Sequence, residues 1–289
     1  MTSMTSAPLA GSSSDVSLAV TGGGTNVIAL AAALYAIVRR LSQERRQVRA
    51  LVGSSAGGLS VLGAAFGVDE ERLQAQLEGA CSRNRLIDGG PHNLVMFGAW
   101  ASMVEFRRNA SLVLGGDARL GDARTPVACM VSDQWTGRPR IVSSWEHPGA
   151  SAVDLACATA AIPYVFERQK IRGLDDHHYV DGGVAKNLAS DELDRFGCPV
   201  VSLRLQSPAR LPAEPRGPLG RLLANAELLM HASNNAWESD HADSIIVDVP
   251  GENGLDFDLL REDCVRRRRA GQLAGEGCRL PPPGQPATR

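Results

Sequence analysis

A serine stands between two glycines in residues 53–57, GSSAG, after an apolar segment and before a segment of small residues. In the pattern G-x-S-x-G the glycines remove side chains that would block a sharp strand-to-helix turn, and the serine hydroxyl is held out above the sheet. Backbone N–H groups at the start of the helix can stabilise a developing oxyanion. The pattern therefore predicts Ser55 as a nucleophile, with a plain strand-to-helix turn as the structural alternative.

A second glycine cluster, Gly22, Gly23 and Gly24, also lies between a predicted strand and a predicted helix. Successive glycines let their backbone N–H groups converge on one anion without intervening side chains. Neither GxxxxGK[ST] nor GxGxxG can be recognised here, so nucleotide binding is the weaker interpretation. An oxyanion hole that serves Ser55, one βαβ unit further along the chain, explains the same loop.

The proton acceptor for Ser55 is less obvious. In the usual α/β-hydrolase order the histidine follows the serine and the acid, and of the six histidines only His231 and His241 come late enough. Both lie in or beside the polar stretch MHASNNAWESDH, which is typical of a solvated helix face. The serine also comes very early, after two predicted strands, which argues against the common triad.

Two aspartates offer another base, because the tripeptide DGG occurs twice. Asp181 ends the apolar segment HHYV, and strand ends are where an α/β sheet presents functional groups. Asp88 follows the polar stretch CSRNRLI and is more typical of a turn, so Asp181 is favoured. The neighbouring residues 175–178, DDHH, do not favour a metal site, because adjacent strand residues point to opposite faces.

The segments that must position these residues alternate between two patterns. Strands are predicted at about residues 16–20, 48–53, 125–133, 140–145, 177–181, 199–205 and 244–249. Helices are predicted from the glycine cluster to about residue 43, after Ser55, and at 151–162, 188–197 and 220–238. Strands interleaved with helices imply a mostly parallel sheet covered on both faces, which is an α/β fold.

Composition narrows the functional classes. A chain of 289 residues with a formal charge of −2 can build one large domain and has no general attraction for nucleic acid. Six scattered cysteines without a CxxC pair favour reduced thiols in a cytoplasmic protein over disulfides or zinc. The longest apolar run, residues 27–38, falls short of the roughly 20 residues that span a bilayer and predicts a buried helix.

The ends of the chain differ from its middle. Residues 1–14 lack the basic start and apolar run of a signal peptide and predict a flexible leader. Residues 276–289 are rich in proline and glycine and predict a disordered tail. The predicted ordered domain is therefore residues 15–275.

Four pieces occur in a fixed order: TGGGT at 21–25, GSSAG at 53–57, ATAAIPYVF at 158–166 and YVDGGVAKN at 179–187. With VSDQWTGRPRIVSS at 131–144, this order resembles the patatin-like phospholipases over about residues 15–206. The resemblance implies a three-layer fold and a lipid acyl hydrolase with a serine–aspartate dyad that needs no histidine, calcium or other cofactor. By position it assigns Ser55 as nucleophile, Asp181 as base and Gly22 to Gly24 as the oxyanion loop.

Two places depart from the family's pattern. The glycine loop usually continues with a basic residue and another glycine, where this chain has Asn26 and Val27. The proline that is usual two residues after the asparagine following DGG is here Ala189. Both positions of the dyad are nonetheless filled, so we expect an active enzyme.

Two further segments bear on the substrate. Residues 91–106 place five large apolar side chains at roughly helical spacing: Met96, Phe97, Trp100, Met103 and Phe106. This stripe is typical of a lid that meets lipid and equally of an amphipathic helix packed on the core. The four arginines at 266–269 are typical of a solvated helix face, with contact to anionic headgroups as the alternative.

The sequence therefore predicts a calcium-independent lipid acyl hydrolase that meets phospholipids or related esters by peripheral contact with a membrane. Three alternatives remain open: a Ser-His-Asp esterase, an acyltransferase with the same dyad, and a non-catalytic module that binds membrane or protein.

Overall fold

A computed structural model of the protein describes residues 15–82, 89–206, 217, 221, 225, 228, 245–252, 254, 256 and 258–283. The predicted leader, residues 1–14, lies outside the described residues. So do Asp88, His231, His241 and most of the helix predicted at 220–238.

Within the described residues the central sheet has seven strands: β1 (Val16–Val20), β2 (Val48–Ser54), β3 (Val127–Asp133), β4 (Arg138–Ser143), β5 (Tyr179–Asp181), β6 (Val200–Gln206) and β7 (Ile245–Pro250). Their order is β4-β3-β2-β1-β6-β7, and β5 pairs with β3 off this path. The β2–β3, β1–β2, β1–β6 and β6–β7 pairs are parallel, whereas β4 and β5 run antiparallel to β3. The predicted α/β fold with a mostly parallel sheet is confirmed.

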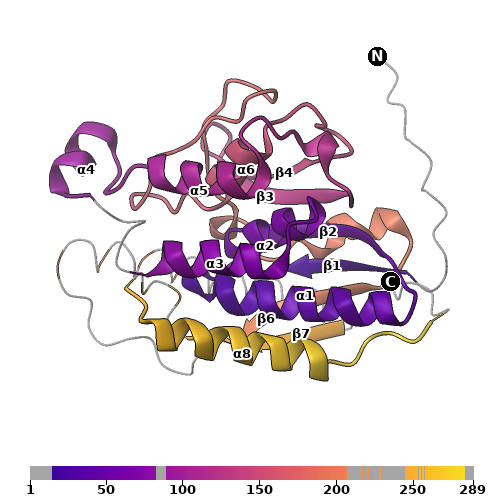
Figure 1. The fold of residues 1–289 in the computed structure, drawn as a ribbon. Coiled ribbons are helices and arrows are strands. Elements are labelled where there is room, and N and C mark those ends of the chain that lie inside the picture. The colour runs from indigo at the N-terminus through magenta and orange to yellow at the C-terminus, as the bar shows by residue number, and fades with distance from the viewer. Residues whose placement is uncertain are drawn as a thin grey trace, which may run out of the picture.

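The described α-helices are α1 (Val27–Gln43), α2 (Ala56–Ala65), α3 (Glu70–Cys81), α4 (Pro91–Phe97), α5 (Val104–Leu114), α6 (Ala152–Thr159) and α8 (Arg261–Gly277). Short 3-10 helices are η1 (Gly24–Asn26), η2 (Leu120–Asp122), η3 (Gly182–Val184) and η4 (Ser190–Phe196). Figure 1 shows how these elements surround the sheet.

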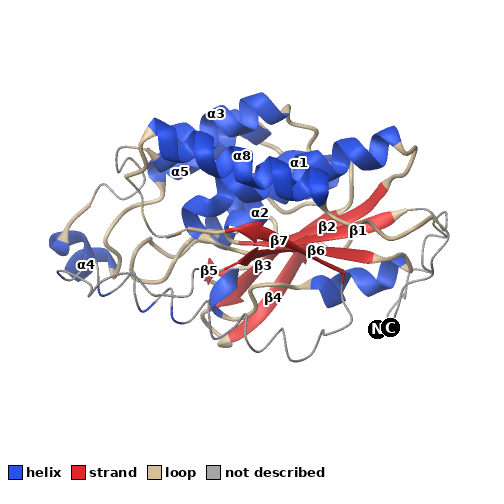
Figure 2. Ribbon diagram, turned by 90° about the horizontal axis from the view of Figure 1, so that it is seen from below, coloured by secondary structure: helices blue, strands red, loops and turns tan. Residues whose placement is uncertain are grey.

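Helices α1, α2, α3, α5 and α8 gather on one face of the sheet (Figure 2). On the other face, Leu188, Ala189 and Leu193 pack in one apolar cluster with Val52 of β2 and Met130 of β3. The sheet is therefore the middle of three layers. Strands β1 and β3 are buried along their whole length, as their near-continuous apolar sequences require.

Helix α1 is apolar on most of its surface, and neighbouring helices cover that surface. Together with η1 it forms a stretch, Gly24–Gln43, of 20 residues that is long and apolar enough to cross a membrane by length and composition. Yet 72% of the apolar 18-residue window within this stretch is buried inside the protein, where α1 packs on α2, α3 and α8. This placement matches the buried helix predicted from residues 27–38.

The segment 91–106 does not form one helix. It divides into α4 and the start of α5 because Gly98 ends α4 with φ at 70°, a left-handed conformation that suits glycine. Between the two helices, Met103 is buried with Val165 and Phe166 in an apolar cluster. At least this part of the predicted stripe serves the core.

Two other predicted boundaries differ. The helix predicted at 188–197 is instead η4, a 3-10 helix. Helix α8 continues to Gly277, and Arg40 of α1 donates to the carbonyl oxygens of Gly275 and Cys278, both at 2.9 Å. Residues 276–278 therefore belong to the folded body and not to the predicted tail.

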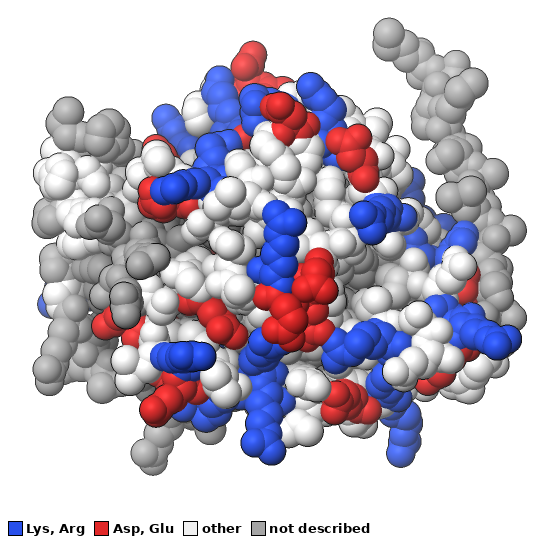
Figure 3. Space-filling view, in the orientation of Figure 1, with Lys and Arg blue, Asp and Glu red and all other residues white. Residues whose placement is uncertain are grey.

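Charged side chains of both signs are interleaved over the face shown in Figure 3. This mixture agrees with the formal charge of −2 for the whole chain. The described residues on this face form no extended basic surface of the kind that binds nucleic acid.

Candidate active site

Ser55 occupies a strained turn between β2 and α2. Its φ of 50° and ψ of −122° are values that residues with side chains rarely adopt and that persist only where the surroundings enforce them. The flanking glycines permit this turn. A Cβ on Gly53 would lie 2.5 Å from the backbone of Gly57, and a Cβ on Gly57 would lie 2.3 Å from the carbonyl oxygen of Val20. The local geometry is that of a nucleophile elbow.

The carboxylate of Asp181 faces this serine from the end of β5. The Oγ of Ser55 donates to Oδ2 of Asp181 at 2.5 Å, and the other carboxylate oxygen accepts the backbone N–H of Gly183 at 2.7 Å. The backbone of Asp181 is also fixed, because its N–H donates to Ala161 at 2.9 Å and its carbonyl accepts the hydroxyl of Ser132 at 2.8 Å. Its side chain is therefore held toward Ser55.

Burial changes the acidity of Asp181. The residue is fully buried, and this desolvation raises the pKa of its carboxyl from 3.8 to about 7, although the hydrogen bonds from Ser55 and Gly183 act in the opposite direction. A carboxyl group with a pKa near neutrality can take a proton from a hydroxyl and return it more readily than an exposed aspartate can. The pair can thus perform acid–base chemistry without an imidazole.

Thr159, which the sequence did not single out, holds the backbone of Ser55 from the end of α6. Its Oγ1 accepts the backbone N–H of Ser55 at 3.0 Å and donates to the carbonyl oxygen of Met130 at 2.7 Å. The elbow is thereby tied to both α6 and β3. The only sequence signal is a lone threonine in the small-residue run ATAAI.

Asn187 is a second residue that the sequence did not assign to the site. Its Oδ1 accepts the backbone N–H of Gly22 at 2.9 Å, and its Nδ2 donates to Oγ1 of Thr21 at 2.9 Å. Gly22 lies next to Ser55, since a Cβ on Gly22 would be 2.9 Å from the Cβ of Ser55. Asn187 therefore links the segment after Asp181 to the glycine loop beside Ser55.

The three glycines of the loop are not equivalent. The N–H of Gly22 is engaged by Asn187. Within the described residues, the N–H groups of Gly23 and Gly24 donate to no protein acceptor. Gly24 lines the same cavity as Ser55 and has a φ of 57°. Gly23 and Gly24 are therefore the loop residues whose N–H groups remain available to an anion.

The described histidines do not contact the serine hydroxyl. His177 pairs through Nδ1 with Oδ2 of Asp133 at 2.9 Å. The pKa of His178 is lowered by burial and by the nearby charges of Arg168 and Lys170. Among the residues that the structure describes, no group of three or more His, Cys, Asp or Glu side chains could hold a metal ion.

An apolar cavity of about 50 Å³ opens beside Ser55, and its walls come from the glycine loop, α2, α3, α5 and residues 160–166. A second apolar cavity, of about 60 Å³, lies between α2, α3, α5 and α6. Four residues line both cavities: Leu59, Leu77, Ala80 and Phe106. The two spaces are thus neighbours, separated by these shared side chains.

Three solved structures resemble this chain at low sequence identity. VipD from Legionella pneumophila superposes with a TM-score of 0.50 and 13% identity over 90% of this chain. Human GIVD cytosolic phospholipase A2 in complex with methyl gamma-linolenyl fluorophosphonate has a TM-score of 0.48 and 12% identity over 91% of this chain. ExoU in the ExoU–SpcU complex of Pseudomonas aeruginosa has a TM-score of 0.41 and 16% identity over 93% of this chain. The chain spans only 65%, 57% and 51% of these three proteins, respectively. No curated protein sequence matches it.

A family model places the chain more directly. The model for patatin-like phospholipases matches residues 18–194, which is more than half of the chain and includes the glycine loop, the elbow serine and Asp181. The fold agrees with this match, because the mostly parallel three-layer architecture is shared with VipD. The protein therefore belongs to the patatin-like phospholipase family.

Proposed function

We propose that this protein hydrolyses ester bonds of phospholipids or related lipids through a dyad of Ser55 and Asp181, without histidine or calcium. The observation that carries the proposal is the 2.5 Å hydrogen bond between the serine hydroxyl and a buried carboxylate. The raised pKa of Asp181, about 7, supports a role as general base near neutral pH.

In the first half of the reaction, Oγ of Ser55 attacks the ester carbonyl carbon while its proton passes to Oδ2 of Asp181. The carbonyl oxygen becomes an oxyanion that accepts hydrogen bonds from the N–H groups of Gly23 and Gly24. When the tetrahedral intermediate collapses, the bond to the alcohol breaks and Asp181 returns its proton to the departing oxygen. The acyl group is left as an ester on Ser55.

In the second half, a water molecule takes the place of the alcohol. Asp181 accepts a proton from this water, whose oxygen attacks the acyl carbon, and the same N–H groups stabilise the second oxyanion. Collapse breaks the bond to Oγ of Ser55, which regains its proton from Asp181. The products are a free fatty acid and the original enzyme.

The cavities beside Ser55 support a fatty acyl substrate. The cavity beside Ser55 is lined in part by Leu59, Leu77 and Phe106, and apolar surface favours apolar ligand atoms. The second cavity extends the same kind of surface between α2, α3 and α5. The acyl chain of the substrate would lie along these helices, with its ester at the elbow.

Exposed apolar side chains on α4 and α5 support peripheral contact with a lipid surface. Val95 is 84% exposed and Val104 is 65% exposed, and Figure 1 shows α4 projecting from the body. The chain between the two helices joins the cavity wall, because Ala101 forms a β-bridge with Phe166, which lines the cavity beside Ser55. This arrangement would place the cavity close to the membrane.

A vesicle assay tests the proposal. Fatty acid release is measured in excess chelator for the wild type, Ser55→Ala, Asp181→Asn and the double variant. Each single change should lower turnover by orders of magnitude while the protein stays folded, and the double variant should be little worse, because the two groups act as a unit. Matched controls are His177→Ala and His178→Ala, which should keep most activity.

Three results would contradict the proposal. The first is complete loss of activity in chelator that added calcium restores. The second is a folded histidine variant, including His231→Ala or His241→Ala, that loses as much as Ser55→Ala. The third is a folded wild type that binds vesicles without releasing acyl groups, which would favour a binding module. Ester products that dominate over free acid when alcohol is added would identify an acyltransferase.

A further inference from the structure

The glycine loop is held from outside the residues that match the family model. Asn26, two residues after Gly24, donates through Nδ2 to the carbonyl oxygens of Gly23 at 3.1 Å and Glu252 at 2.9 Å. Its Oδ1 accepts the backbone N–H of Glu252 at 3.0 Å. Thr25 donates its backbone N–H to the carbonyl oxygen of Gly254 at 2.7 Å. The segment after β7 therefore fixes the loop through its own backbone.

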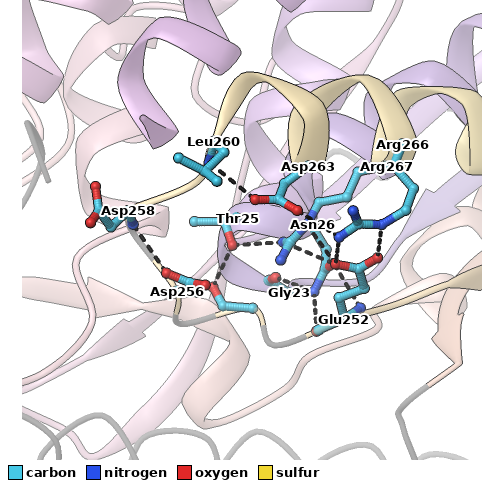
Figure 4. A network of polar contacts seen from close by, with 11 residues as sticks. Gly23, Thr25, Asn26, Glu252, Asp256, Asp258, Leu260, Asp263, Arg266 and Arg267 are labelled. Carbon is cyan, nitrogen blue, oxygen red and sulfur yellow. Dashed lines mark hydrogen bonds and ion pairs between the residues drawn. The ribbon is translucent and has the colours of Figure 1, made fainter. Parts of the chain in front are cut away.

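Arg267 of α8 completes this network (Figure 4). It is 4% exposed, and its Nη1 donates to Oγ1 of Thr25 at 2.8 Å and to Oδ1 of Asn26 at 3.3 Å. Its Nε lies 3.4 Å from a carboxylate oxygen of Glu252. The neighbouring Arg266 also pairs with Glu252, at 2.8 Å, but its side chain is 55% exposed. Of these two arginines, Arg267 is the one whose hydrogen bonds reach the loop.

Close packing of α8 on α1 places Arg267 beside the glycine loop. Gly271 and Gly275 follow it at intervals of four, on the same face of α8. A Cβ on Gly271 would lie 2.0 Å from the carbonyl oxygen of Ala29, and a Cβ on Gly275 would lie 2.5 Å from that of Ala33. The two glycines thus let α8 lie directly on α1. The next residue in the series, Arg267, reaches the start of α1, where the glycine loop enters the helix.

Burying the guanidinium of Arg267 at this position is unfavourable in free energy unless its contacts compensate for the burial. A buried guanidinium loses hydration, and the amino end of a helix carries partial positive charge that opposes a cation. The pairing with Glu252 and the bonds to Thr25 and Asn26 offset part of this cost. A methionine or leucine would fill such a place without any charge to compensate. What arginine adds at this position is its set of hydrogen bonds to Thr25 and Asn26, which hold the loop.

We propose that Arg267 is a positioning residue for catalysis: from the C-terminal helix it locks Thr25 and Asn26 and so aims the N–H groups of Gly23 and Gly24 at the oxyanion. The catalytic use of the loop rests on the function proposed above. Arg267 itself does not touch the substrate. The residues that position the loop then extend past residue 194, where the family match ends, to the segment at Glu252 and to Arg267 of α8.

The test compares Arg267→Met with Arg266→Met, the matched control from the same helix and the same ion-pair cluster. Two quantities are measured: amide hydrogen exchange of residues 22–26, and kcat and KM for ester hydrolysis. We expect Arg267→Met to speed exchange in the loop and to lower kcat by about 10- to 100-fold with little change in KM, because misplaced donors weaken mainly the transition state. Arg266→Met should match the wild type in both measurements.

Two further variants separate positioning from general loss of fold. Thr25→Val removes a hydroxyl that Arg267 bonds, at little change in volume, and should lower kcat in the same way. The Thr25 hydroxyl also donates to the carbonyl oxygen of Gly254 at 3.1 Å. Combined with Arg267→Met, the change should lower kcat by less than the product of the two single effects, because both variants remove the contact between Arg267 and Thr25. Arg267→Lys, which keeps the charge, should recover part of the kcat.

The outcomes distinguish this inference from the proposed hydrolysis. If the wild type hydrolyses esters but Arg267→Met, folded, keeps its kcat and loop exchange, the positioning role is wrong. The same holds if the effects of Thr25→Val and Arg267→Met simply multiply, or if Arg266→Met behaves like Arg267→Met. If the wild type hydrolyses nothing, the proposed function fails, whereas the exchange measurement still tests whether Arg267 holds the loop.

Discussion

The Oγ of Ser55 lies 2.5 Å from Oδ2 of Asp181, although 126 positions separate the two residues in the chain. The sheet brings them together through β3. In the parallel pair of β2 with β3, Ser54 lies opposite Met130, and in the antiparallel pair of β5 with β3, Asp181 lies opposite Val131. Neighbouring residues of one central strand therefore set the spacing of the two groups that we propose as the dyad.

The pH dependence of hydrolysis should follow the ionisation of Asp181. The group must be ionised to accept the proton of Ser55, and burial raises the pKa of its carboxyl to about 7. We therefore expect kcat/KM for an uncharged ester to rise with pH up to an apparent pKa near 7 and to level off above it. A profile that is already flat from pH 5 upward would contradict this assignment.

The same shift should reduce stability at higher pH. The pKa of Asp181 is higher in the folded state than in the unfolded state. Its ionisation therefore lowers the free energy of unfolding: this loss is absent below about pH 4, grows as pH rises, and is complete above about pH 7. A shift from 3.8 to about 7 corresponds to about 4 kcal/mol. The free energy of unfolding of Asp181→Asn, relative to the wild type, should therefore increase by that order between pH 4 and pH 8.

Urea unfolding at several pH values measures this difference. Other titrating groups contribute equally to both proteins and cancel. Ser132→Ala, which removes a bond to the backbone carbonyl of Asp181 but leaves its carboxylate bonds, is the control. Its stability difference from the wild type should not vary with pH, and an Asp181→Asn difference that is also constant would show that the carboxyl is not strained by burial.

The two apolar cavities predict how acyl-chain preference can be changed. Phe106 lines both cavities, whereas Ala110 lines only the second one. Phe106→Ala should join the spaces and raise the ratio of kcat/KM for long over short acyl esters. Ala110→Phe should fill the distal space and lower the same ratio, with short-chain hydrolysis unchanged. If both variants leave the ratio as it is in the wild type, the acyl chain does not lie between α2, α3 and α5.

Membrane contact through α4 should affect hydrolysis only at a lipid surface. Val95→Asp places a charge on a residue that is 84% exposed, so the fold should tolerate it. We expect weaker vesicle binding and slower hydrolysis of vesicle lipids, with unchanged hydrolysis of a soluble short-chain ester. Val265→Asp is the matched control, because Val265 is 55% exposed on α8. Equal effects of the two variants on vesicle hydrolysis would exclude α4 as the contact.

The strands and the elbow could be predicted because their signals are local. The apolar runs mark the strands, and glycines at 53 and 57 mark a turn that only residues without side chains permit. Asp181 could be predicted to lie near Ser55 because it ends an apolar strand. The antiparallel pairing of β5 with β3 was not predictable, since a three-residue strand carries too little pattern to reveal its partner.

The contacts that support the site could not be predicted. Thr159 acts through a single hydroxyl in a run of small residues. Arg267 meets Thr25 across 242 positions of sequence. Within RRRR at 266–269, residue type does not show which arginine is buried. The available signal was the spacing of Arg267 from Gly271 and Gly275, which marks one face of the helix.

The apolar side chains at 91–106 have helical spacing, yet the segment forms two helices and not one. Its spacing fits one amphipathic helix, but Gly98 lies inside it and ends α4 in a left-handed conformation. The side chain of Met103 then enters the core, while Val95 remains exposed on α4. A glycine within a helical stripe is a stronger boundary signal than the apolar spacing around it.

The central claim, that Asp181 takes the proton from Ser55 directly, is tested most directly by the rate at which an alkyl fluorophosphonate modifies Ser55. In this reaction Oγ displaces fluoride from phosphorus and its proton must pass to a base. Mass spectrometry of the wild type should locate the adduct on Ser55, at a rate that rises with pH through about 7. In folded Asp181→Asn the rate should fall by orders of magnitude. Labelling of Ser55 in Asp181→Asn at the wild-type rate, or an adduct on another residue, would contradict the claim.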